Sequence, residues 1–319
     1  MTESRTVFID CNDQLRPVFD AVSRPSDPPI HVNQAPFTSE DLPRLLDGCE
    51  ICIVDHSYMP TDIVARCADL RHIVFLGTGP QSYMDIEALR GRGVTVHAIK
   101  GYGDTAVAEH AVALMFACAR DLARMDRDIR SGTWRPREGV QLRGKKLGII
   151  GLGGIGAEVA RIAEGIGMEV LAWNRTPRPG APEPVAIEDL LKVADVVSLH
   201  LALSDETRGF LDTARLAMMK RGAILINTAR GALIDEAALV DALKSGHIAR
   251  AGLDVFALEP ARADHPLAQL DSVTLSAHAG FRTYEASATL LGRALDIVRR
   301  LAPARGALGA MRLGSGPKN

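Results

Sequence analysis

Short apolar runs alternate with segments of helical periodicity along almost the whole chain. This alternation is typical of βαβ units, in which parallel strands form a sheet and the connecting helices cover its faces. It occurs in two successive series, which are separated by a longer stretch of helical periodicity at about 105–131. The sequence therefore predicts an α/β fold with two parallel sheets.

The limits of the expected elements follow from these runs. The expected strands are 7–9, 51–54, 73–76 and 94–96 in the first series, and 146–150, 169–173, 195–199, 223–227, 251–254 and 273–275 in the second. The expected helices are 39–48, 60–69, 85–91, 105–131, 155–165, 187–193, 213–219, 235–245 and 283–301. Since 319 residues exceed the roughly 100–200 of a usual domain, each series is expected to form its own domain. The helix 105–131 is expected to connect them, and the Gly/Pro-rich tail 302–319 to be disordered.

Charge and targeting signals exclude several classes of function. Lys and Arg number 37 against 39 Asp and Glu, a net charge of -2 that offers no basic surface for nucleic acid or an anionic membrane. No signal-peptide pattern and no apolar run near the roughly 20 residues of a membrane helix is present, so a cytoplasmic protein is expected. Cys49 and Cys52 form an isolated CxxC pair in a strand-like run, which favours core thiols over a redox or metal site.

A GLGGIG segment at 151–156 stands directly between an expected strand and an expected helix. The first glycine permits the tight turn, the second lets the backbone approach a pyrophosphate, and the third lets helix and strand pack closely. The N–H groups and dipole of the following helix then favour an anion. In this context the segment predicts dinucleotide binding through Gly151, Gly153, Gly154, Ile155 and Gly156.

The residues at the end of the second strand of this series indicate which dinucleotide binds. NAD-specific folds place Asp or Glu there for the ribose 2′-hydroxyl, whereas this chain has Asn174, Arg175 and Thr176. An amide, a guanidinium and a hydroxyl can receive a 2′-phosphate, so NADP(H) is favoured over NAD(H). The alternative is that Arg175 stacks on the adenine ring and that NAD(H) binds.

Three segments that follow expected strands carry an arginine, a glutamate and a histidine, namely Arg230, Glu259 and His278. Because ligands of doubly wound sheets bind past the carboxyl ends of the strands, these side chains are expected beside the nicotinamide. Arg230 can hold a carboxylate and a carbonyl oxygen in fork geometry. His278 can donate or accept the hydroxyl proton, and Glu259 can orient and stabilise its imidazolium. The sequence therefore predicts a hydride-transfer site.

Two further segments extend this pattern, VAEH at 107–110 and HLALSDETRG at 200–209. With them the chain, from about 55 to 301, resembles the D-isomer-specific 2-hydroxyacid dehydrogenase family. The resemblance implies two Rossmann-like domains: a flavodoxin-like substrate domain at 1–99, completed by the C-terminal helix 282–301, and an inserted NAD(P)-binding domain at 100–281. It also implies a catalytic triad of Arg230, Glu259 and His278 and a homodimer joined through the nucleotide domains.

The resemblance also places the remaining contacts. The further cofactor contacts that it implies are Val107, His200, Leu201, Ala202, Thr207, Thr228, Ala229, Asp254 and Gly280. The expected substrate contacts are Ser57, Tyr58, Thr78 and Gly79, with Arg230 and His278. The backbone N–H groups of Thr78 and Gly79 are expected to bind the substrate carboxylate. Ala202 departs from the family's usual proline, and the loop that begins at Gly77 is about one residue longer, which leaves the substrate open.

The expected function is oxidoreduction between NAD(P)(H), with NADP(H) favoured, and a D-2-hydroxy acid/2-keto acid pair. Glyoxylate or hydroxypyruvate reduction is the preferred subclass, and D-3-phosphoglycerate oxidation is the alternative. A cofactor-sensing binding protein similar to the C-terminal-binding corepressors of the family is the alternative from another class. The expected enzyme is a cytoplasmic homodimer without a metal, and its partner is a small-molecule acid.

Overall fold

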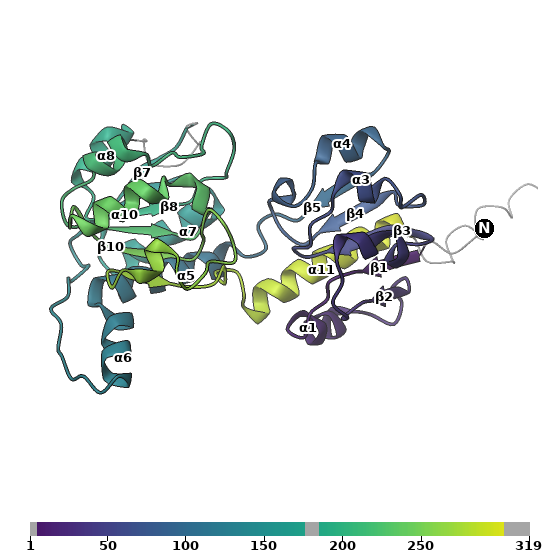
Figure 1. Cartoon of the computed structure of the whole chain (residues 1–319), viewed down its shortest axis with the longest axis horizontal. Helices are drawn as coiled ribbons and strands as arrows, with labels where there is room; N and C mark the ends of the chain where they lie inside the picture. Colours follow the sequence, from purple (N-terminus) through teal and green to yellow (C-terminus); the bar gives the residue numbers. More distant parts are fainter. Residues whose placement is uncertain (1–4, 176–184, 303–319) are drawn as a thin grey trace, which may run out of the picture. The chain divides into compact units, whose positions relative to one another are not determined.

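The computed structural model describes residues 5–175 and 185–302, so Thr176 and the expected tail beyond residue 302 lie outside the described residues. The chain divides into two compact units. Unit 1 is formed by the chain up to Gly103 and from Thr283 onward, and unit 2 by Asp104–Arg282. Each unit is a parallel sheet with helices on both faces (Figure 1), which confirms the prediction of two parallel-sheet α/β domains.

Unit 1 has a five-stranded sheet in the order β2-β1-β3-β4-β5, all parallel. This is the flavodoxin-like order, which reverses between β1 and β3. Its strands are β1 (Arg5–Phe8), β2 (Ile30–Val32), β3 (Cys49–Val54), β4 (His72–Phe75) and β5 (Thr95–Ala98). Its helices are α1 (Leu15–Val22), α2 (Leu42–Leu45), α3 (Thr61–Val64), α4 (Ile86–Gly91) and α11 (Tyr284–Leu301), with 3-10 turns η1 (Ser39–Asp41) and η2 (Pro80–Ser82).

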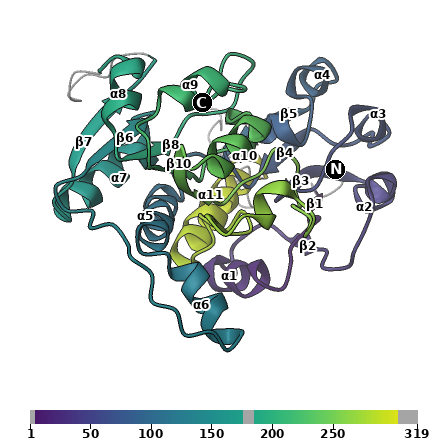
Figure 2. The ribbon, with the colours of Figure 1, turned by 60° about the vertical axis from the view of Figure 1, so that its left-hand side comes forward.

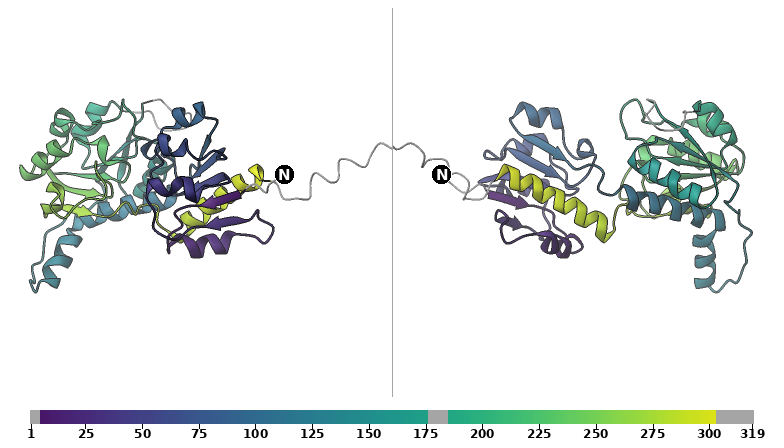
Figure 3. Two further views of the ribbon diagram at one scale, coloured as in Figure 1. Left: turned by 45° about the vertical axis from the view of Figure 1, so that its right-hand side comes forward. Right: turned by 180° about the vertical axis from the view of Figure 1, so that it is seen from behind.

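The C-terminal helix α11 covers one face of the unit 1 sheet together with α1 (Figure 3). Its buried side chains recur at helical spacing: Leu290, Leu291, Ala294, Leu295 and Val298. Burying one such leucine contributes about 1.5–3 kcal/mol, so α11 supplies a large part of this core. The opposite face packs against α2, α3 and α4.

Unit 2 has a six-stranded parallel sheet in the order β11-β10-β9-β8-β6-β7. Its strands are β6 (Lys146–Ile150), β7 (Glu169–Trp173), β8 (Val196–Leu199), β9 (Ala223–Asn227), β10 (Ile248–Leu253) and β11 (Val273–Leu275). Its helices are α5 (Asp104–Arg120), α6 (Leu122–Arg130), α7 (Gly154–Gly165), α8 (Ile187–Val193), α9 (Thr213–Met218) and α10 (Glu236–Lys244). Two 3-10 turns are η3 (Gly231–Leu233) and η4 (Pro266–Gln269).

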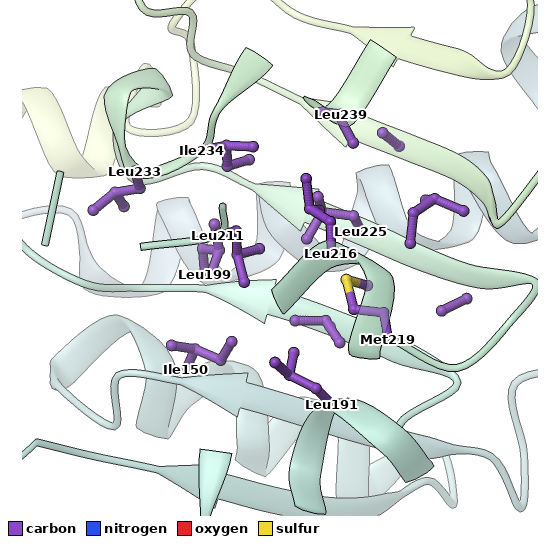
Figure 4. Close-up of a cluster of buried hydrophobic side chains, with 14 of the residues drawn as sticks. Ile150, Leu191, Leu199, Leu211, Leu216, Met219, Leu225, Leu233, Ile234 and Leu239 are labelled. Atoms are coloured by element: carbon purple, nitrogen blue, oxygen red, sulfur yellow. The ribbon is translucent and has the colours of Figure 1, made fainter. Parts of the chain in front are cut away.

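The central strands of this sheet are buried on both faces, as is usual in parallel sheets. One face packs against α5 and α7, which lie side by side (Figure 2). The other packs against α8, α9 and α10, where leucine and isoleucine side chains of strands and helices interdigitate (Figure 4). This core fixes the strand ends that carry the site.

Helix α5 is followed directly by α6, but the two are separate helices. Asp121 between them has a left-handed backbone with a φ of 54°, so the continuous helix predicted at 105–131 is wrong. Its carboxylate lies 3.7 Å from Arg137 Nε and 3.4 Å from Arg250 Nε. These arginines hold a conformation that costs a non-glycine residue about 1–2 kcal/mol. Helix α5 packs within unit 2, and α6 projects from the rest of that unit (Figures 1 and 3).

The five cysteines belong to the cores, and all are buried and free. Burial raises the pKa of Cys49 to about 11 and raises the pKa of Cys52 well above its usual value, so both thiols stay protonated and unreactive at neutral pH. The described residues contain no group of three or more His, Cys, Asp or Glu side chains that could hold a metal ion. None of the described helices has the length and hydropathy to cross a membrane.

Candidate active site

The polar residues predicted from the sequence of unit 2 lie at one edge of its sheet. Because all six strands are parallel, every loop that leaves a carboxyl end emerges at this edge. The glycine turn follows β6, and the three predicted catalytic residues follow β9, β10 and β11. The strand order reverses between β6 and β8, and such a reversal creates the crevice where doubly wound sheets bind ligands.

The glycine turn leaves no room for a side chain at Gly151, Gly154 or Gly156. Gly151 has a φ of 101°, and its N–H donates to the carbonyl of Trp173 at 2.8 Å. A Cβ atom on Gly156 would lie 2.2 Å from the carbonyl oxygen of Gly151, and one on Gly154 would meet the Asp104 carboxylate at 1.9 Å. A Cβ on Gly153 would point into open space. The turn therefore exposes backbone at the start of α7, whose first N–H groups have no intrahelical partner.

The loops after β7 and β8 border this turn on either side, because β7 and β8 flank β6 in the sheet. The Asn174 Oδ1 atom accepts a hydrogen bond from the Leu152 N–H at 2.9 Å, which ties the end of β7 to the turn. Asn174 therefore has a structural role, which is to hold the glycine turn against the end of β7, in addition to its predicted contact with a 2′-phosphate. In the loop after β8, the Thr207 hydroxyl donates to the Ala202 carbonyl at 2.7 Å and accepts from the Ser204 N–H at 2.8 Å.

The residues at this edge fit a dinucleotide. Two buried polar atoms, Thr228 Oγ1 and His200 Nδ1, have no hydrogen-bond partner among the described residues. Burial lowers the pKa of His200 to about 4, so its ring is neutral at neutral pH. A cofactor along this edge would supply partners for such atoms. The remaining predicted cofactor residues also lie here or at the start of the adjoining helices: Val107 in α5, Ile155 in α7, Leu201 and Ala202 after β8, Ala229 after β9, Asp254 after β10 and Gly280 after β11.

The loop that carries Arg230 is fixed by a buried asparagine at the end of β9. The Asn227 side chain donates to the Arg230 carbonyl at 2.9 Å and accepts from the Ala229 N–H at 3.0 Å. The next residue, Gly231, packs so closely that a Cβ there would lie 1.9 Å from the backbone of Phe256. This glycine brings the loops after β9 and β10 together, and Arg230 acts electrostatically on Glu259.

Glu259 and His278 form a direct hydrogen-bonded pair. The Glu259 Oε2 atom lies 2.7 Å from His278 Nδ1, and Oε1 accepts the Phe256 N–H at 2.9 Å. Burial alone would raise the pKa of Glu259, but the hydrogen bonds from His278 and Phe256 outweigh it and hold the pKa below its usual value. The carboxylate is therefore ionised at neutral pH, and it orients the imidazole through Nδ1. Such a pair can act as a general acid–base.

Asp254, which is 2% exposed, anchors the loop that carries His278. Its carboxylate accepts the Ser276 hydroxyl at 2.6 Å and the N–H groups of Ala279 and Gly280 at 2.9 Å. Its carbonyl accepts the His278 N–H at 2.8 Å. These bonds hold His278 in a left-handed backbone conformation with a φ of 49°. Strained backbone of this kind persists only where the surroundings over-determine it, so Asp254 fixes the position of the catalytic candidate.

The predicted substrate loops lie at the carboxyl ends of β3 and β4 in unit 1. The half-buried carboxylate of Asp10, after β1, accepts the N–H groups of Asp55 at 2.8 Å, His56 at 3.2 Å and Ser57 at 3.1 Å. Tyr58 is 61% exposed. The Asp10 carboxylate therefore orders the loop that follows β3, beside the point between β1 and β3 where the strand order of unit 1 reverses.

The second predicted substrate loop of unit 1 follows β4. The N–H groups of Thr78 and Gly79 make no hydrogen bond with any described residue. Two aromatic rings, of Phe75 and Tyr83, pack on each other at 5.4 Å and hold this loop next to the one that contains His56. The two unpaired N–H groups are thus available donors on an ordered loop.

Three residues that position the site had no assigned role in the sequence analysis, namely Asn227, His110 and Ser276. His110 Nε2 lies 2.8 Å from Ser276 Oγ and 3.3 Å from Asp254 Oδ1, so these side chains form one network. The only available signal was their position beside the predicted residues in the same short segments. His110 and Ser276 are 166 residues apart in the chain, so no local pattern can identify their contact, whereas Asn227 bonds to residues two and three positions away.

Comparison with protein-family models gives a match for residues 112–280. The matching family is described as "D-isomer specific 2-hydroxyacid dehydrogenase, NAD binding domain". The matched segment runs from within α5 to Gly280 and thus contains the glycine turn and the Arg230, Glu259 and His278 loops.

Curated relatives and solved structures match over most of the chain. A glycerate dehydrogenase of Methylorubrum extorquens is 35% identical over 92% of this chain and 95% of its own length. A D-3-phosphoglycerate dehydrogenase of Archaeoglobus fulgidus is 35% identical over 78% of this chain but only 49% of its own length. The crystal structure of a glyoxylate reductase from Paecilomyes thermophila matches with a TM-score of 0.83 and 30% identity, over 95% of this chain and 96% of that one.

Proposed function

The chain belongs to the D-isomer-specific 2-hydroxyacid dehydrogenase family, and on that premise we propose that it reduces a small 2-keto acid to a D-2-hydroxy acid. The observation that carries the proposal is the 2.7 Å hydrogen bond between Glu259 and His278. It lies at the edge of the same sheet whose glycine turn is open to a dinucleotide.

Each residue of the triad has one role in this proposal. His278 donates a proton to the carbonyl oxygen of the keto acid and takes it back in the reverse direction. Glu259 keeps the ring oriented through Nδ1 and stabilises its protonated form. Arg230 binds the substrate carboxylate through its guanidinium. When bound, the nicotinamide supplies or accepts the hydride.

We propose that the N–H groups of Thr78 and Gly79 also donate to the substrate carboxylate that Arg230 binds, and that Ser57 and Tyr58 contact the remainder of the substrate. Glyoxylate or hydroxypyruvate is the preferred substrate, and the likeness to a glycerate dehydrogenase and a glyoxylate reductase supports this choice. D-3-Phosphoglycerate oxidation is the alternative, supported by a relative of that name that shares only part of its length with this chain.

A panel of 2-keto acids, assayed with NADH and with NADPH, tests the proposal. We expect oxidation of the reduced cofactor with glyoxylate and hydroxypyruvate, and slower oxidation with the larger 2-ketoisocaproate. Oxidation of D-3-phosphoglycerate without reduction of either short keto acid would favour the alternative. Tight cofactor binding without turnover of any acid in the panel would contradict the proposed enzyme and favour a cofactor-sensing protein.

We propose NADPH as the preferred cofactor, with Arg175 as the residue that receives the 2′-phosphate. A hydrogen bond to a charged group contributes about 1.5–3 kcal/mol, so Arg175→Ala is expected to weaken NADPH binding roughly tenfold or more and NADH binding much less. Fluorescence titration of each cofactor measures this difference. Equal weakening of both cofactors would show that Arg175 stacks on adenine instead.

We also propose that the chain forms a homodimer through unit 2. Large apolar side chains are exposed on α5, on α6 and on the segment that follows: Phe116, Leu122, Ile129, Trp134 and Val140. A two-fold contact through this surface would be expected to bury more than about 1,000 Å². Sedimentation velocity at micromolar concentration tests it, and a monomer there would exclude the proposal.

A further inference from the structure

An ion pair joins the two loops that border the glycine turn. Arg175 follows β7 and Glu206 lies in the loop after β8, and the Arg175 guanidinium donates directly to the Glu206 carboxylate. Because β6 lies between β7 and β8 in the sheet, this ion pair connects the two sides of the site from which the turn emerges. The pair lies within unit 2, and neither partner belongs to the Arg230, Glu259 or His278 loops.

The backbones that carry the two partners are held in place independently of the ion pair. On the β7 side, the bond from Leu152 to Asn174 fixes the residue before Arg175. On the β8 side, the hydroxyl of Thr207, the residue after Glu206, closes its own loop through the Ala202 carbonyl. The proximity of the two charges therefore follows from the fold and not only from two long side chains.

We propose that Glu206 sets the preference between NADPH and NADH by competing with a 2′-phosphate for Arg175. This inference rests on the proposed function, since it concerns the nicotinamide cofactor. The chain lacks an acidic residue at the end of β7, where NAD-specific folds carry one. Glu206 supplies a carboxylate to the same place from another loop.

The competition has a definite direction. A 2′-phosphate that approaches Arg175 must displace the Glu206 carboxylate, and the displaced carboxylate remains close to a group of the same charge. The side chains of Arg175 and Glu206 are 67% and 73% exposed, so their ion pair is weak enough to open. NADH has no 2′-phosphate and leaves the pair intact. Glu206 therefore weakens NADPH binding and has little effect on NADH.

The test is Glu206→Gln, which removes the charge and keeps the size of the side chain. Dissociation constants of NADPH and NADH are measured by fluorescence titration, and those of adenosine 2′,5′-bisphosphate and 5′-AMP by calorimetry. We expect about three- to tenfold tighter binding of the two 2′-phosphorylated ligands and less than about twofold change for the others. The gain should shrink in high salt, because both groups are exposed.

Two further variants make the test specific. Asp205→Asn removes the neighbouring exposed charge of the same loop, which is not the partner of Arg175, and is expected to leave the ratio of the two cofactors within about twofold. In an Arg175→Ala background the Glu206→Gln change should have no effect, since no cation remains to compete for. An equal gain in that background would overturn the competition.

An unchanged NADPH to NADH ratio in Glu206→Gln would also overturn the inference. The outcome for the proposed function is read separately, from turnover of the keto acids by the unmodified protein. Turnover with an unchanged ratio rejects only the role of Glu206. Cofactor binding that responds to Glu206→Gln without any turnover rejects only the proposed reaction, and absence of binding by either dinucleotide rejects both.

Discussion

Replacing Asp254 with asparagine is expected to loosen the loop that carries His278. The carboxylate accepts hydrogen bonds from the Ser276 hydroxyl and from the Ala279 and Gly280 N–H groups. An asparagine offers one acceptor oxygen, and its NH₂ group must face at least one of these donors. A buried donor left without a partner costs about 1–3 kcal/mol, and the retained bonds lose their charge assistance. The expected loss is about 2–4 kcal/mol in the free energy of unfolding.

The pH dependence of this loss has a fixed sign. Burial alone would raise the pKa of Asp254, but hydrogen bonds from His110, Ser276 and the two N–H groups outweigh it, and the pKa is lowered. The carboxylate therefore stabilises the fold above its unfolded-state pKa of about 3.9, and this stabilisation is lost as the pH falls through the folded-state value. The difference in the free energy of unfolding between the native chain and Asp254→Asn should be largest at pH 7 and should decrease below about pH 4.

Thermal and urea unfolding at pH 7.5 measure the effect. A loss of 2–4 kcal/mol corresponds to a decrease of roughly 4–16 °C in Tm for a unit of this size. The kcat of keto-acid reduction is expected to fall about 10–100-fold, since displacement of an acid–base group by about 1 Å has effects of that order. Asp271→Asn is the control, because Asp271 is 63% exposed and pairs with Arg124 at the surface, so it should change stability by less than about 0.5 kcal/mol. Equal stability and activity of the two variants would refute the reasoning.

Three further predictions concern the same edge of the sheet. Gly156→Ala should weaken NADH binding at least about tenfold in fluorescence titration, because its Cβ would lie 2.2 Å from the Gly151 carbonyl oxygen; unchanged affinity would mean that the turn is not the pyrophosphate site. Burial opposes ionisation of Glu259, but the hydrogen bond from His278 lowers its pKa, so the carboxylate is ionised at neutral pH. Removing this charge in Glu259→Gln should move the pH profile of reduction roughly one unit lower. An unmoved profile would contradict this role of Glu259. His278→Ala should lower kcat about 10²–10⁴-fold with NADH binding nearly unchanged, and normal turnover would mean that another group supplies the proton.

The strands of unit 2 were the most predictable part of the fold. The central strands at 146–150 and 223–227 have the limits expected from their apolar runs, because central strands of a parallel sheet need apolar side chains on both faces. The edge strands at 169–173 and 273–275 also have the expected limits. Two elements of unit 1 were missed. Strand β2 is three residues long with none of them buried, so it has no strong apolar signal. Helix α1 has buried apolar residues at helical spacing, Leu15, Val18 and Phe19, and this signal was overlooked in a short helix that contains Pro17.

The features that could not be predicted depend on contacts between distant residues. Asp121 ends α5 without a glycine or proline, because Arg137 and Arg250 hold its left-handed backbone. Within the site, the residues predicted at the strand ends do lie along one edge, since parallel strands require it. The four hydrogen bonds that Asp254 accepts from the loop at 276–280 arise only once β10 and β11 are paired.

The discontinuous construction of unit 1 has a consequence for how the chain is made. The N-terminus leaves the ribosome first during synthesis. Strands β1 to β5 therefore emerge long before α11, the helix that covers one face of their sheet. Unit 2 is continuous, and all of its segments are synthesised before α11 is complete. The N-terminal unit, which usually folds first during synthesis, must here wait for the last helix. Until then only α1 covers this face, so apolar side chains such as Ile51 and Val74 are less completely buried in the nascent chain than in the folded protein, and apolar surface exposed in this way favours aggregation.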